Sequence, residues 1–348
     1  MNKPKISIVA GNGLSISFGH FSGLAHHWNS QEPLSWPIDC PSHRHNFLNS
    51  LPRLKALHDK YIEHPDFDVF AKALDNATCT KHDIDPFITP LEARHFLTIA
   101  FSNYSNKQIE LLETCKEWPW YKWIELHKGN IVSAFSLNYD LLLESIFDGV
   151  ALQYFSLQVN HHGHGIPLVK PHGSVDFEIH PSSISYKPNY PLTNFVDLND
   201  TPIIRLEANK LIYPRSQPLC IIPNESNKYS GYQWVAPANR LFNEEVSKCT
   251  HCIFIGISYF ECDRPELDSI LDRIPISAQI IVANPNPPQE FMERLKGRPV
   301  MIWSSYNGPL DSKGNLFTLK DIKTGNLLRN CFCRSGLSYQ YCCGAKLL

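Results

Sequence analysis

The 348-residue chain has no excess of charge of either sign and no long apolar run. Its 32 Lys and Arg residues against 34 Asp and Glu residues give a formal net charge of −2, so the basic surface typical of nucleic-acid-binding proteins is not indicated. No stretch of about 18 apolar residues occurs, and the apolar run near the amino terminus is too short for a secretory signal peptide. We therefore expect a cytoplasmic protein that has no membrane span and does not bind nucleic acid directly.

The cysteines of the chain do not indicate a disulfide framework. Of the 11 cysteines, five lie singly along the sequence: Cys40, Cys79, Cys115, Cys220 and Cys262. An odd number of scattered thiols is typical of a reduced, cytosolic protein. Cys249 and Cys252 form a Cys-x-x-Cys pair, but the sequence has no second pair nearby, and Cys252 opens an apolar run. We interpret both as structural cysteines rather than zinc ligands.

Glycine is absent from residues 31–128, a region that is rich in aromatic residues and histidine. Without glycine, the tight turns between strands and helices of an α/β sheet are not expected there. Residues 66–77 and 89–115 instead have apolar residues at helical spacing. This region is predicted to be a mostly helical insertion.

Outside that region, short apolar runs alternate with amphipathic stretches. The runs predict strands that begin at Ile6 and recur within residues 130–140, 167–174, 251–258, 278–287 and 299–304. The stretches between them predict helices within residues 140–147, 234–249, 264–274 and 288–296. Near-continuous apolar strands separated by helices indicate a parallel sheet that is covered on both faces. We therefore expect a doubly wound, Rossmann-like α/β domain over residues 1–310, with loops and short strands at 176–233.

Small and polar residues follow five of the predicted strands, where ligands bind in open α/β sheets. These residues are Gly11, Asn12, Gly13 and Ser15; Asn138 and Asp140; His172; Gly256 and Ser258; and Asn284. The first turn offers backbone N–H groups and a helix start to an anion, although Ile16 replaces the third glycine of the G-x-G-x-x-G fingerprint. Taken singly, Asn138 and Asp140 could be helix caps and His172 a core histidine. Their shared place at strand ends favours a binding site.

Five short segments resemble the motifs of the sirtuin-like family in order and spacing: AGNGLS, SLNYD, KPHGS, FIGIS and VANPNP. The resemblance covers residues 5–30 and 130–305. It implies that residues 1–310 bind NAD. Gly11, Asn12, Gly13 and Ser15 would then hold the diphosphate, Gly256 and Ser258 the phosphate or ribose, and Asn284 the adenosine ribose.

The same resemblance places Asn138 and Asp140 at the nicotinamide and its ribose, and makes His172 the general base for a ribose hydroxyl. These residue types suit cleavage of the nicotinamide–ribose bond, which passes through an oxocarbenium-like state. Histidine is a residue type that can take a hydroxyl proton near neutral pH. Gly173, beside the histidine, is expected to leave room for the sugar.

Two departures from the family concern protein deacylation. The segment after the glycine turn lacks the Pro-Asp-Phe-Arg motif of the deacylases, and residues 176–233 contain a single cysteine where those enzymes have two Cys-x-x-Cys zinc pairs. The departures favour hydrolysis of NAD to nicotinamide and ADP-ribose, which in this family implies an effector of bacterial anti-phage defence. An NAD-dependent protein deacylase and a non-catalytic sensor of NAD or ADP-ribose remain as alternatives.

The last residues of the chain form a cysteine cluster. Cys331 and Cys333 are separated by eight residues from Cys342 and Cys343, and four thiolates at this spacing suit a tetrahedral, structural zinc site. The spacing resembles the SEC-C motif, which implies a docking module over residues 326–348 that contacts a protein or the ribosome. We expect a homo-oligomer or a defence complex. The role of a second cluster, His161, His162 and His164, is left open.

Overall fold

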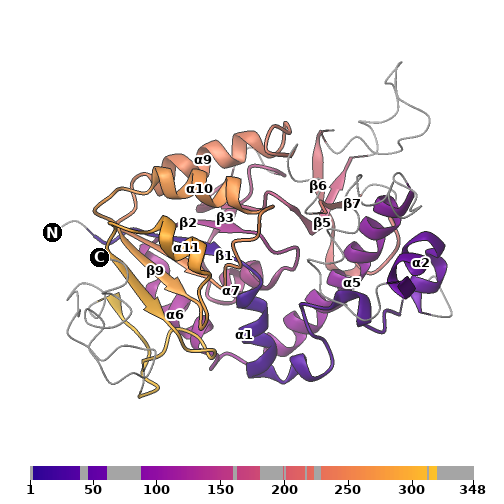
Figure 1. The fold of residues 1–348 in the computed structure, drawn as a ribbon, viewed down its shortest axis with the longest axis horizontal. Helices are drawn as coiled ribbons and strands as arrows, with labels where there is room; N and C mark the ends of the chain where they lie inside the picture. Colours follow the sequence, from indigo (N-terminus) through magenta and orange to yellow (C-terminus); the bar gives the residue numbers. More distant parts are fainter. Residues whose placement is uncertain are drawn as a thin grey trace.

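The computed structural model describes residues 3–39, 46–60, 88–159, 163–180, 199, 201–215, 218–222, 229–311 and 313–319. At its centre is a seven-stranded parallel sheet with the strand order β10-β9-β8-β1-β2-β4-β3 (Figure 1). The strands are β1 (Ile6–Ala10), β2 (Ile131–Ser136), β3 (Tyr154–Phe155), β4 (Ile166–Val169), β8 (His251–Ile255), β9 (Gln279–Ala283) and β10 (Val300–Trp303). The doubly wound parallel sheet that the sequence predicts is confirmed.

Helices cover both faces of this sheet. One face packs against α1 (Gly13–Ser22), α6 (Pro119–His127) and α7 (Leu142–Gly149). The other packs against α9 (Ala236–Val246), α10 (Arg264–Arg273) and α11 (Gln289–Arg294), which lie together in Figure 1. Neighbouring residues of β1 divide between the two faces: Ile8 belongs to the first core and Val9 to the second. Because both faces are buried, the strand sequences are apolar without alternation.

The strand order places a topological switch point between β1 and β8. From β1 the chain continues outward to β2 and then β4, and from β8 it continues in the opposite direction to β9 and β10. In such sheets the loops at the carboxyl ends of the two central strands separate, and a crevice forms between them. The predicted site residues therefore meet at a place where this fold leaves room for a ligand.

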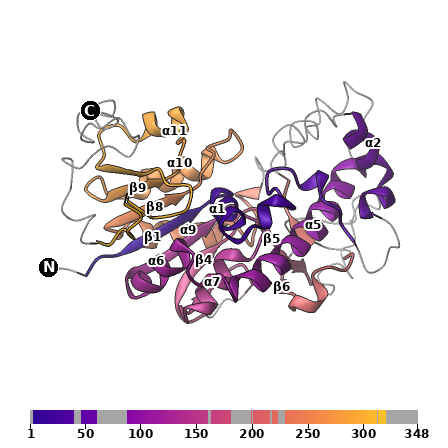
Figure 2. The same ribbon diagram turned by 90° about the horizontal axis from the view of Figure 1, so that it is seen from below.

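A smaller lobe lies beside the sheet (Figure 2). It contains an antiparallel sheet of order β6-β5-β7 together with α2 and α5. Its elements are α2 (Pro52–Lys60), α5 (Ile88–Leu112), β5 (Gly173–Ile179), β6 (Ile203–Arg205) and β7 (Pro218–Cys220). For the part of this lobe within residues 176–233 the sequence predicts loops and short strands, and β6 and β7 have three residues each; the seven-residue β5 begins directly after His172.

The glycine-free region is helical where the structure describes it. The helix predicted over 89–115 is confirmed as α5, whereas the helix predicted at 66–77 lies outside the described residues. A further helix of the region, α6, belongs to the main core, since Trp120 and Trp123 pack against Trp303 of β10. None of the described helices is both long and apolar enough to cross a membrane.

Candidate functional site

A cavity of about 540 Å³ opens at the carboxyl ends of the central strands, a volume within the usual range for small-molecule sites. It brings together nine of the ten residues predicted at strand ends: Gly11, Asn12, Gly13, Asn138, Asp140, His172, Gly256, Ser258 and Asn284. These residues come from five different strands, so only the folded sheet could assemble them. Ser15, the tenth, lies behind the wall with a side chain that is 0 % exposed.

The glycines after β1 and β8 allow two backbone loops to touch. A Cβ atom on Gly13 would lie 2.3 Å from Gly256 Cα, and Gly256 itself has a φ of +59°. The N–H of Gly11 donates to Ile255 O at 2.8 Å, and the N–H of Gly13 donates to Gly256 O at 3.1 Å. These two N–H groups therefore hold the loops together and are not available to a ligand.

The amino terminus of α1 supplies positive potential at the same wall. Asn12 and Gly13, at the start of this helix, line the cavity. The first turn of α1 contains no acidic residue, and no side chain caps it. The uncompensated positive end of a helix dipole attracts anions, so this wall suits a phosphate group.

Asn138 and Asp140 are fixed by hydrogen bonds to the turn after β1. Asn138 Nδ2 donates to Gly11 O at 3.0 Å and to Ser15 Oγ at 3.3 Å. The Ser15 hydroxyl in turn donates to Asp140 Oδ2 at 2.6 Å. Burial raises the pKa of Asp140, while the Ser15 hydrogen bond and the charge of Lys170 act against that rise. The structure thus gives Ser15 contacts that orient a carboxylate, and its predicted role at a diphosphate stays a prediction.

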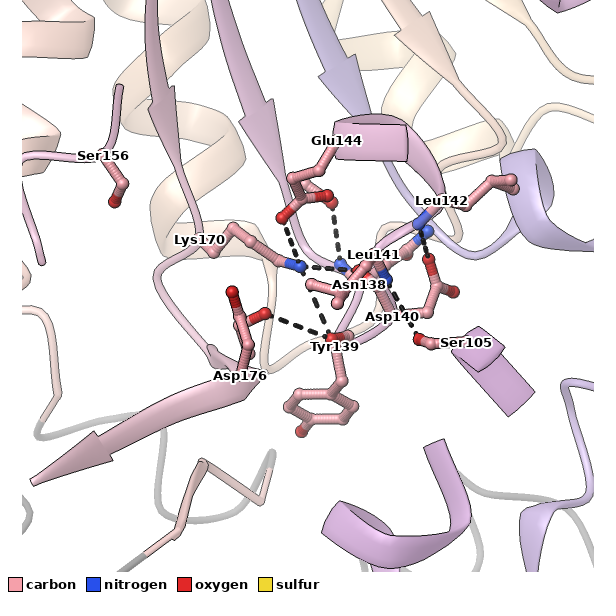
Figure 3. Close-up of polar contacts among 12 residues, drawn as sticks. Ser105, Asn138, Tyr139, Asp140, Leu141, Leu142, Glu144, Ser156, Lys170 and Asp176 are labelled. Carbon is pink, nitrogen blue, oxygen red and sulfur yellow. Dashed lines mark hydrogen bonds and ion pairs between the residues drawn. The ribbon is translucent and has the colours of Figure 1, made fainter. Parts of the chain in front are cut away.

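Lys170 donates hydrogen bonds to the turn that contains Asn138 and Asp140 (Figure 3). Its Nζ donates to Asp140 O at 2.6 Å, to Tyr139 O at 3.4 Å and to Glu144 Oε1 at 2.9 Å. The Lys170 and Glu144 side chains are only 1 % and 5 % exposed. Lysine is rarely buried without a partner, and here the ammonium group replaces water as the donor to two carbonyls of the turn. Sequence reasoning included this lysine in a motif but gave it no role.

His172 lies between β4 and β5 and is 4 % exposed. Its Nε2 is 2.8 Å from the Tyr229 hydroxyl and 3.8 Å from Asp263 Oδ1. The expected reason for the neighbouring glycine is corrected. Gly173 has a φ of +80°, and a Cβ there would lie 1.8 Å from Leu219 O, so the glycine is needed for packing against β7 rather than to leave room for a sugar.

Three residues near His172 were missed by sequence reasoning: Tyr229, Asp263 and Glu266. Tyr229 is fully buried, and Asp263 and Glu266 are 8 % and 7 % exposed. Burial raises the pKa of Glu266, while the charge of the nearby His172 opposes this rise. The segment that contains both acids has the pattern of an amphipathic surface helix, so nothing in the sequence distinguishes them from solvated carboxylates.

The far rim of the cavity is formed after β8, β9 and β10. Asn284 Nδ2 donates to Ile257 O at 3.0 Å, and its Oδ1 accepts from the N–H of Asn286 at 2.9 Å. Asn286 in turn donates to the hydroxyl of Tyr306, which is 60 % exposed. Asn284 is therefore a brace between two loops as well as a lining residue.

Two kinds of functional group line the cavity. One is the imidazole of His172, with the carboxylate of Asp263 near its Nε2 atom. The other is the amide of Asn138 together with the carboxylate of Asp140, and both contact the segment that follows β1. A base, a carboxylate and an amide that line one cavity can move a proton of a bound molecule and favour positive charge that develops on it.

The predicted zinc ligands Cys331, Cys333, Cys342 and Cys343 lie outside the described residues, as do His161 and His162. Within the described ranges, no group of three or more His, Cys, Asp or Glu residues could hold a metal ion. Cys249 and Cys252 are buried, and burial raises the pKa of Cys249 to about 11. Its thiol form is therefore stabilised over the thiolate that zinc requires.

No protein-family model matches the chain, and no curated protein matches it. The chain is similar to solved structures of Sir2 proteins. One is a Sir2 homologue in complex with NAD, with 12 % identity, a TM-score of 0.38 and coverage of 88 % of this chain and 86 % of that chain. Another is Sir2Tm bound to a propionylated peptide, with 12 % identity, a TM-score of 0.31 and coverage of 87 % and 89 %. Similarity at this level assigns no reaction.

Proposed function

We propose that this protein hydrolyses NAD to nicotinamide and ADP-ribose. The observation that carries the proposal is the convergence of His172, Asn138 and Asp140 on one cavity at the switch point of the sheet. The cavity also has the uncapped amino terminus of α1 on its wall, and NAD requires a site for its diphosphate. A dinucleotide bound across the switch point of a doubly wound sheet fits the general rule for such folds.

In the proposed reaction the bond between the ribose C1′ and the nicotinamide nitrogen breaks, and its electron pair leaves with nicotinamide. Positive charge then develops on the ribose, and we assign its stabilisation to Asp140, whose ionised form is favoured by Ser15 and Lys170. His172 takes a proton from a ribose hydroxyl and returns it to the same oxygen after the bond has broken. Water adds at C1′, and its second proton is released.

Asn138 is assigned to the water or to the nicotinamide amide. Both of its side-chain hydrogen bonds within the protein use Nδ2. We therefore assign Oδ1 to accept a hydrogen bond from the water or from the nicotinamide amide. The diphosphate is assigned to the start of α1, the exposed Ser258 to the adjoining ribose, and the rim at Asn284 to the adenosine ribose. The departures from the deacylase motifs favour water over an acylated lysine as the second reactant.

The test is to incubate the purified full chain with NAD and to follow nicotinamide and ADP-ribose by chromatography, with and without an acetyl-lysine peptide. We expect both products without peptide, and a reduction of about 10²-fold or more in His172→Ala and Asn138→Ala. His26→Ala, at an exposed histidine outside the cavity lining, is the matched control and should keep full activity. Product that forms only with the peptide would identify a deacylase, and binding of NAD without turnover would identify a sensor.

The biological setting is proposed from sequence alone. Within this proposal the chain acts in the cytoplasm as an effector of anti-phage defence, as a homo-oligomer or within a defence complex. Residues 326–348 bind one structural zinc ion and dock a protein or the ribosome. Since the segment is too short to bury a core, metal binding has to supply most of its folding free energy.

A further inference from the structure

Tyr139 lies between Asn138 and Asp140 in the sequence, yet its side chain belongs to the smaller lobe. Its main chain is part of the turn that follows β2. Its ring is 6 % exposed and packs in a core formed by α5, β5 and β7, where the ring centroid of Phe101 lies 5.5 Å away. In Figure 3 the Tyr139 ring points away from Lys170. One residue therefore has its main chain at the large sheet and its side chain in the smaller lobe.

The Tyr139 hydroxyl donates to the main-chain oxygen of Ile221, the residue directly after β7. Ile221 is fully buried, and a buried carbonyl requires a donor from the protein. The N–H of the same residue donates to His172 O at 2.8 Å. Both polar groups of the Ile221 main chain are therefore engaged, one by Tyr139 and the other by His172, so that a single residue links the tyrosine hydroxyl to the predicted base.

The main chain of Tyr139 is attached to the same region at a second point. Tyr139 O accepts from the N–H of Val175 at 3.1 Å and from Ser174 Oγ at 3.4 Å. Both donors belong to β5, which begins directly after His172. The segment around His172 is thus bonded to Tyr139 twice, through β5 at the carbonyl and through the residue after β7 at the hydroxyl. This double attachment leaves the segment less freedom to move than either hydrogen bond would alone.

We propose that Tyr139 is a positioning residue whose hydroxyl, acting through Ile221, holds His172 in place. Asn138 and Asp140 are the chain neighbours of Tyr139, so the same residue relates the base to both of them. Proton transfer requires such placement, because a displacement of about 1 Å can lower a rate by about 10²-fold. The effect on turnover rests on the proposed NAD hydrolysis, whereas the placement of the imidazole does not.

The placement can be measured without any turnover. Tyr139→Phe removes the hydroxyl and keeps the ring. NMR of the histidine rings, with the His172 signals assigned from a His172→Ala variant, reports the surroundings of the imidazole in the absence of NAD. We expect the His172 signals to shift or broaden in Tyr139→Phe, and those of His251, at the start of β8, to stay the same. Tyr213→Phe, at a tyrosine that is 47 % exposed and outside the cavity lining, should change neither. Unchanged His172 signals in Tyr139→Phe would overturn the proposal.

Turnover provides the second measurement, through a double-mutant cycle. Tyr139→Phe should lower kcat for NAD by about 10-fold with a smaller change in KM, and Tyr213→Phe should keep full activity. In a His172→Ala background, Tyr139→Phe should lower kcat by less than about twofold, because the residue that it positions is already lost.

Tyr139 also lines the cavity, and the cycle separates positioning from direct contact with the substrate. A loss of about 10-fold in both backgrounds would mean that Tyr139 acts on the substrate or on the fold as a whole, and the proposal would be wrong. Absence of NAD hydrolysis in the wild type would overturn the proposed function, and the NMR result would still decide whether Tyr139 holds His172.

Discussion

Replacement of Lys170 by methionine should lower the unfolding free energy by about 3–5 kcal/mol, the usual result of removing one partner from a buried ion pair. The pair with Glu144 is 2.9 Å long, and the two side chains are 1 % and 5 % exposed. Glu144 Oε2 has no hydrogen-bond partner, so Lys170 is the main compensation for this buried charge. Methionine would also leave the carbonyls of Tyr139 and Asp140 without the ammonium donor.

The loss should depend on pH in a defined direction. Burial already raises the pKa of Glu144, and the charge of Lys170 opposes this rise. Without the lysine the folded-state pKa rises further above the unfolded value. A carboxyl group whose folded-state pKa is higher than its unfolded-state pKa destabilises the folded state most when it is ionised, at pH values above the folded-state pKa. The difference between wild type and Lys170→Met should therefore be largest at neutral pH and shrink as the pH falls and Glu144 takes a proton.

Urea unfolding followed by tryptophan fluorescence measures the change. The double variant Lys170→Met/Glu144→Leu removes the uncompensated charge and should recover part of the stability, but it restores no donor to the turn, so NAD turnover should stay low. Lys55→Met, which breaks the exposed pair with Asp59, should cost less than about 1 kcal/mol. A loss below about 1 kcal/mol in Lys170→Met, or full activity in the double variant, would refute the reasoning.

Three further outcomes are expected. Gly13→Ala, with a Cβ 2.3 Å from Gly256 Cα, should separate the two loops and weaken NAD binding in a calorimetric titration, whereas Gly129→Ala, with only a side-chain contact at 3.7 Å, should not. Burial lowers the pKa of His127 from 6.5 to about 4. The unfolding free energy should therefore decrease as the pH falls from 6.5 to about 4, by up to about 3 kcal/mol. A His127→Gln variant that shows the same decrease would contradict this. Metal analysis should find one zinc ion per chain, absent after truncation at Asn330, and NAD cleavage should survive the truncation.

Much of the large sheet could be predicted from the sequence because its strands are short apolar runs with helices between them. The site could be located for a related reason. Parallel strands have their carboxyl ends at one edge, so Asn138, His172 and Asn284 were expected at the same edge of the sheet even before the strand order was known. That inference requires only the direction of the strands, which the helical connections determine.

The parts that escaped prediction depend on contacts between distant segments. Tyr229 and Asp263 reach His172 from separate segments that follow it in the chain, and no local pattern marks such a meeting. Short strands were expected within residues 176–233, but their pairing with β5 into an antiparallel sheet was not, because three-residue strands have too little periodicity to show which strands pair. The reason for Gly173 was missed as well, because the atom that excludes a Cβ there belongs to Leu219, on a strand far along the chain.

The chain crosses from the large sheet to the small one at His172. Lys170 follows the last residue of β4, and Gly173 is the first residue of β5. Asn138 and Asp140 follow β2 of the large sheet, whereas the main-chain carbonyl of His172 accepts from the N–H of Ile221, the residue after β7 of the small sheet. A hydrogen bond from the N–H of Val175 to Tyr139 O, 3.1 Å long, is a direct link between these two bodies. The placement of His172 relative to Asn138 and Asp140 is therefore set by how the small sheet joins the large one, and α5 takes part in this junction because its Phe101 also lines the cavity.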